Sequence, residues 1–77
     1  MKKGEARVKT CQYKIVTQDG VYIAEDYGRE SGGWIWARNV FYQGKTFSNG
    51  NWHAGRWRYY SDVVTFNKDD VKRIIKL

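Results

Sequence analysis

The sequence predicts a small, mostly β domain: a barrel or rolled antiparallel sheet of about five short strands, on the scale of SH3-like or OB-like barrels. Short stretches rich in β-branched and aromatic residues alternate in polarity, turn residues separate them at tight spacing, and the chain contains no proline. With 77 residues, the chain is expected to form one domain at residues 7–77, after a flexible basic lead-in at residues 1–6.

The first predicted element is a β-hairpin over residues 7–26. Its first strand places Cys11, Tyr13 and Ile15 on one face by period-two alternation, and Gln18-Asp19-Gly20 supplies turn chemistry before the second strand. Residues 27–33 contain three glycines and are expected to form a mobile loop. This loop lacks the glycine spacing of the known phosphate-binding motifs.

Residues 34–43 predict a strand that is apolar on both faces, which is typical of a covered central strand. Gly44-Lys45 is expected to break it, and Asn49-Gly50 is the strongest hairpin signal in the chain. The two predicted faces of the strand at residues 34–43 are Trp34, Trp36, Val40 and Tyr42 on one side and Ile35, Ala37 and Phe41 on the other. In the later strand at residues 56–61, Arg56, Arg58 and Tyr60 are expected to face one way and Trp57 and Tyr59 the other.

A further short strand is expected at residues 62–66, and the tail after it has two interpretations. Asn67 can cap a short C-terminal helix with acids in its first turn and bases in its last, and this is the favoured interpretation. The alternative is a single turn at residues 68–71 that leads into a closing strand at residues 73–77.

The net charge of +6 favours polyanionic partners and disfavours a mimic of DNA. Cys11 is the only cysteine, so an intrachain disulfide is excluded, and a reducing compartment is expected. No secretory signal and no apolar run of membrane-spanning length is visible, so the protein is expected to be soluble and cytoplasmic, with no membrane partner.

Residues 31–61 contain no carboxylate, hold all four tryptophans, and carry cations at Arg38, Lys45, Arg56 and Arg58. Aromatic rings stack on bases while cations neutralise phosphates, so this stretch predicts a non-catalytic module that binds nucleic acid or a phosphorylated nucleotide. The competing interpretation is that the rings form the core and the arginines are merely solvated. The predicted ligand-binding residues are Arg38, Arg56, Arg58, Tyr60, Trp36 and Trp52.

No metal, cofactor or catalytic residue is predicted. One cysteine and one histidine fall short of the four ligands of a structural zinc site. His53 is the one conventional general base, and its ordinary interpretation is an exposed loop residue. Cys11 is expected on an apolar strand face, where thiols are generally inert.

A second function class has the same composition. Tryptophan, tyrosine and arginine are also enriched at protein–protein hot spots. The alternative is therefore a small accessory or inhibitor protein of a phage or mobile element, which acts on a host protein in the host cytoplasm. A homodimer whose interface covers some of the exposed rings is a further alternative.

Overall fold

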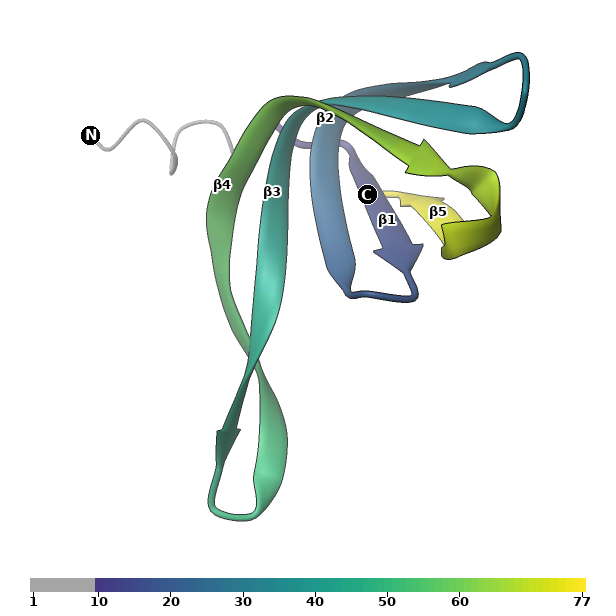
Figure 1. Ribbon diagram of the computed structural model, residues 1–77. Coiled ribbons are helices and arrows are strands. Elements are labelled where there is room, and N and C mark those ends of the chain that lie inside the picture. The colour runs from purple at the N-terminus through teal and green to yellow at the C-terminus, as the bar shows by residue number, and fades with distance from the viewer. Residues whose placement is uncertain (1–9) are drawn as a thin grey trace.

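The computed structural model of the protein describes residues 10–77, which form one antiparallel sheet of five strands (Figure 1). The strands are β1 (Tyr13–Thr17), β2 (Val21–Glu30), β3 (Trp34–Ser48), β4 (Asn51–Asn67) and β5 (Val71–Lys76), with a 3₁₀ turn, η1 (Lys68–Asp70), before β5. Their order in the sheet is β4-β3-β2-β1-β5, so β4 and β5 are its edges. The mostly β prediction is confirmed for the described residues, but the sheet is not closed, and a barrel is not confirmed.

The predicted N-terminal hairpin is present, with β1 and β2 in register from Tyr13↔Ala24 to Val16↔Val21. Thr17 holds its turn, because its backbone N–H and its hydroxyl both donate to the carbonyl of Gly20, at 2.8 and 2.9 Å. The strand β1 begins later than predicted, at Tyr13. The lead-in at residues 1–6 and the predicted strand start at residues 7–9 lie outside the described residues.

The loop predicted at residues 27–33 is wrong, because β2 continues to Glu30 and only three residues remain for the turn. Gly32 and Gly33 have φ angles of 86° and 85°, so they provide the positive φ that this short turn needs. Gly28 stays in the strand, opposite Trp36 in the register of β2 and β3. A glycine that favours a loop locally is here a strand residue that makes room for a ring.

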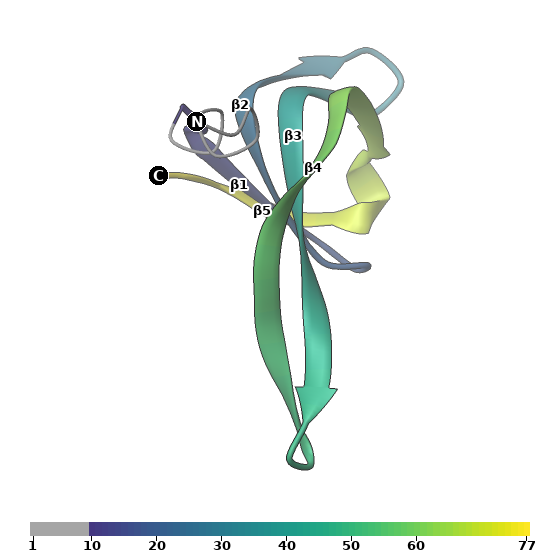
Figure 2. The same ribbon diagram turned by 90° about the vertical axis from the view of Figure 1, so that its left-hand side faces the viewer.

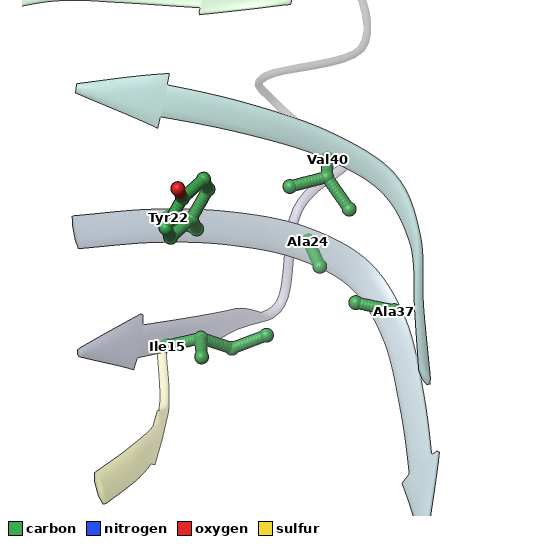
Figure 3. Close-up of a cluster of buried hydrophobic side chains, with 5 residues drawn as sticks. All are labelled: Ile15, Tyr22, Ala24, Ala37 and Val40. Atoms are coloured by element: carbon green, nitrogen blue, oxygen red, sulfur yellow. The ribbon is translucent and has the colours of Figure 1, made fainter. Parts of the chain in front are cut away.

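The core lies on the inner side of a bend in the sheet, where Ile15, Tyr22, Ala24, Ala37 and Val40 form a buried cluster (Figure 3). Ala37 and Val40 both belong to this cluster although they are three positions apart, which simple alternation forbids. The cause lies between them. Asn39 has a φ of 53°, and this left-handed residue shifts the alternation of β3. The predicted face that grouped Val40 with Trp36 is therefore wrong, although β3 does bury residues from both faces, including Ile35 and Phe41.

The favoured C-terminal helix is wrong, and the alternative of a turn followed by a strand is correct. Asn67 does cap a turn, since its side-chain Oδ1 accepts the backbone N–H of Asp69 at 2.9 Å, but the turn ends at Asp70. The chain then pairs with the open edge of β1, where Ile74 lies opposite Ile15 and packs against the core. This pairing with a distant strand outweighs the local preference for a helix.

The predicted Asn49-Gly50 turn is confirmed, and it closes a hairpin in which Ser48 lies opposite Asn51. Asn49 and Gly50 have φ angles of 52° and 77°, the positive values that a two-residue hairpin turn requires. Figures 1 and 2 show that this end of the β3–β4 hairpin projects away from the rest of the sheet. The predicted separate strands at residues 56–61 and 62–66 are one continuous strand, β4.

Candidate nucleic-acid interface

The projecting hairpin contains rings and cations and no carboxylate. The pairing of β2 with β3 ends at Val21↔Gln43, and in the described part of the chain β3 then pairs with β4 alone. We call residues 44–56 the arm. At about 3.3 Å per residue, the five residues from Gly44 to Ser48 extend about 17 Å. Its charged residues are Lys45 and Arg56, both exposed.

Two aromatic rings sit side by side at the end of the arm. Phe47 and Trp52 are directly opposite in the strand register, their ring centroids are 5.2 Å apart, and the planes meet at 62°. Phe47 is 57% exposed and Trp52 is 67% exposed, so neither ring belongs to the core. They form an apolar tip on a polar, cationic ribbon.

The stem of the arm contains the irregularity that the glycines predicted. The register shifts between Gln43 and Lys45, and the side-chain amide of Gln43 donates to the carbonyl of Gly55 at 3.0 Å. A Cβ at Gly55 would lie 2.9 Å from the carbonyl oxygen of Gly44, so the strands approach too closely there for a larger residue. The predicted break at Gly44-Lys45 is thus a bulge within continuous strands, and bulges increase local twist.

Arg58 and Tyr60 continue this surface onto the sheet. Arg58 lies opposite Tyr42, and Tyr60 packs near Tyr22 and Tyr42, with ring centroids 5.5 and 6.2 Å apart. Tyr60 is 54% exposed. Tyr59 instead packs its ring on Phe41, on the opposite face, as the predicted alternation requires.

The other two predicted ligand residues lie elsewhere. Trp36 is half-buried over Gly28, and Arg38 is an exposed residue whose guanidinium is 3.6 Å from the carboxylate of Asp26. Arg38 lies opposite Val63 in β4, five positions from Arg58 in the sequence of that strand. The structure therefore places Trp52 at the tip of the arm, Arg56 and Arg58 at and beyond its stem with Tyr60, and Trp36 and Arg38 on a separate part of the sheet.

Phe47 and Lys45 were absent from the predicted ligand residues, yet both lie on the arm. A signal for Phe47 was present in the sequence. Phe47 and Trp52 flank Asn49-Gly50 symmetrically, and a two-residue turn places such residues opposite each other. No comparable signal marks Lys45, because its place depends on where β2 stops pairing with β3.

Two ionisable groups on other parts of the sheet have raised pKa values. Burial raises the pKa of the Cys11 thiol to about 11, and the Glu25 carboxylate adds to the rise. Burial also raises the pKa of Tyr22, with smaller contributions from Tyr60, Tyr42 and Asp19. His53 is exposed in β4 rather than in a loop, with its Nε2 3.2 Å from the carbonyl of Ser48.

Within residues 10–77, no three histidine, cysteine, aspartate or glutamate side chains gather as a metal site would require. None of the helical structure in that range has the length and apolar character to cross a bilayer. No known protein family matches the chain, and neither a curated protein nor a solved structure shows significant similarity to it.

Proposed function

We propose that the protein is a non-catalytic module that binds nucleic acid, with the arm as its principal contact element. The observation that carries this proposal is the combination of a carboxylate-free two-stranded ribbon, cations at its stem and an exposed ring pair at its tip. Since these groups spread over the length of the arm, they suit a polymer better than a mononucleotide.

The dimensions and the charge of the arm support this proposal. The major groove of B-DNA, about 12 Å wide, admits a two-stranded β-ribbon. Lys45, Arg56 and Arg58 are exposed and would neutralise phosphates, which makes affinity depend on salt. Trp52 and Phe47 would stack on bases or wedge between them, and each stacked base contributes about 1–3 kcal/mol.

Arg58 and Tyr60 would extend the contact from the arm onto the sheet. Arg38 and Trp36 are a separate, secondary part of the proposed surface, because Arg38 already faces Asp26 and Trp36 is half-buried. The proposal therefore depends on the arm and not on those two residues.

The test is a titration of tryptophan fluorescence with single-stranded and duplex oligonucleotides at several salt concentrations. Arg56→Ala with Arg58→Ala is expected to weaken binding and to reduce the slope of log K against log salt by about 1.4–1.8, at 0.7–0.9 per phosphate contact. Arg29→Ala with Arg73→Ala is the matched control, since it removes two exposed arginines from β2 and β5. Equal behaviour of the two double variants would sink the proposal.

The second candidate is the accessory or inhibitor protein that acts on a host protein. The exposed Phe47, Trp52 and Tyr60 favour it, because exposed rings of this kind are also protein hot spots. High-affinity binding of one protein that is insensitive to salt, together with no response to oligonucleotides, would favour this candidate over the first.

We also propose a rolled, barrel-like fold and a cytoplasmic location. The core on the inner side of the bent sheet supports a rolled, small barrel on the SH3-like or OB-like scale. The single cysteine, which excludes an intrachain disulfide, supports a reducing, cytoplasmic setting.

A further inference from the structure

A second candidate surface is a groove of ≈ 380 Å³ between the β1–β2 turn, the last residues of β4 and η1. Its apolar lining includes Tyr22, Trp34, Tyr60 and Phe66. The ring of Tyr22 is 5.0 Å from that of Phe66 and 5.5 Å from that of Tyr60, both in edge-on geometry. Trp34 is 47% exposed and Tyr60 is 54% exposed, so the groove presents ring surface to solvent.

The charge of this groove is opposite to that of the arm. Asp19 and Asp70 line it, and its lining contains no lysine, arginine or histidine. Within residues 10–77 neither carboxylate forms an ion pair. Lys68 and Lys72 each lie two positions from Asp70 in the sequence. The aliphatic chain of Lys68 lies against Gly33, and Lys72 lines an adjoining pocket that also includes Asp19.

These observations disfavour a phosphate backbone as the natural occupant of the groove, because two carboxylates would repel it. Aromatic faces beside carboxylates attract organic cations, through the ring quadrupole and through direct charge. An arginine side chain matches both the rings and the carboxylates of the groove, since its guanidinium stacks on a ring while it pairs with a carboxylate. A groove with exposed rings also leaves room for the chain that carries such a residue.

We propose that this groove binds an arginine-bearing peptide segment of a protein partner, with a guanidinium over the Tyr60 or Trp34 ring and paired with Asp19 or Asp70. This activity is separate from the proposed nucleic-acid binding, because the lining of the groove holds two carboxylates and no cation. Apart from Tyr60, it uses none of the residues assigned to that function.

The probe is a ten-residue peptide with four arginines separated by glycine and serine, compared with the same peptide in which glutamine replaces each arginine. Binding is followed on the full chain by NMR, through the amide shifts of Tyr22, Trp34, Tyr60 and Phe66. The arginine peptide is expected to give saturable shifts there, and the glutamine peptide none. Asp19→Asn with Asp70→Asn is expected to weaken binding about fivefold or more, as the loss of charge-assisted contacts implies.

Glu30→Gln with Asp69→Asn is the matched control, because it removes two exposed carboxylates that do not line the groove. The amide spectrum of each variant shows whether it is folded. Equal weakening in the control, or equal binding of the glutamine peptide, would overturn the proposal. If the same four amides shift with protein concentration alone, the occupant is a second copy, and the proposal of a partner peptide is wrong.

Discussion

The indole of Trp36 lies across Gly28 on the neighbouring strand so closely that a Cβ at residue 28 would be 2.5 Å from two of its ring atoms. The two residues are direct partners in the register of β2 and β3. The ring thus occupies the space that any side chain at residue 28 would need. The half-buried position of this tryptophan therefore depends on a glycine in the next strand.

Gly28→Ala is expected to destabilise the protein by about 1–3 kcal/mol, because the indole must leave its position. Urea unfolding would measure the change. Gly44→Ala is the matched control, since its added Cβ would lie at an ordinary 3.7 Å from Tyr42. In a Trp36→Ala background the cost of Gly28→Ala should largely disappear, and a cost that persists would contradict this assignment.

Asn39 is expected to be required for the bend through its backbone and its side chain. It has a φ of 53°, and its side-chain amide donates to Glu25 Oε2 at 2.9 Å. Asn39→Ala should cost about 2 kcal/mol, since it combines left-handed strain with a lost hydrogen bond. Asn39→Gly should cost less, because glycine accepts positive φ freely. Equal unfolding free energies for the two variants would show that the backbone conformation is not the cause.

Trp52→Ala is expected to weaken oligonucleotide binding about 5- to 150-fold, which corresponds to about 1–3 kcal/mol for a lost stacked base. The unfolding free energy should change by less than about 0.5 kcal/mol, because the side chain is 67% exposed. Val63→Ala removes an equally exposed apolar group away from the arm and is the control. Trp52→Phe should retain much of the affinity. An undiminished affinity in Trp52→Ala would argue against the tip as a contact point.

Cys11 is expected to react slowly with iodoacetamide at pH 8 while the protein is folded. Burial raises its pKa from 9.0 to about 11, and each pKa unit removes about tenfold of the reactive thiolate, so urea-unfolded protein should react at least about tenfold faster. Because the folded state holds the thiol proton more tightly than the unfolded state, Cys11 contributes to the free energy of unfolding. This contribution is fully present below pH 9 and is lost as the pH rises towards 11.

Glu25→Gln tests the second cause of this shift. Without the neighbouring carboxylate the pKa of Cys11 should fall, and the folded protein should be alkylated faster at the same pH. The glutamine oxygen can still accept the hydrogen bond from Asn39, so the bend is retained. Identical rates for folded and unfolded protein would show that the thiol is not buried in solution.

Local signals in the sequence predicted the features that depend on a few neighbouring residues. Asn49-Gly50 specifies its own turn, and this turn places Phe47 opposite Trp52. Asn67 acts as a cap as its side chain suggests, but it caps a short turn before β5 and not the predicted helix. Gly28 and Asn39 behaved differently, because the reason for each lies on another strand: the Trp36 ring in one case and the Glu25 carboxylate in the other.

The candidate site also has a part that local sequence predicts and a part that depends on strand pairing. Its rings and cations are visible in the composition of residues 31–61, but the arm is defined by the point where β2 stops pairing with β3. That point separates Trp52 and Arg56 from Trp36 and Arg38. The groove could not be predicted from the sequence, because its rings come from three strands that are distant in the chain: Tyr22, Trp34, Tyr60 and Phe66.

The strand order also bears on how fast the sheet assembles. The β3–β4 hairpin closes through two residues, whereas Ile15 must meet Ile74 across almost the whole described chain. Closing a long loop costs more entropy than closing a short one, and pairings between distant strands slow folding. We expect the arm to form early and the β1–β5 pairing to form late. The pairing of β5 with β1 is therefore expected to limit the folding rate.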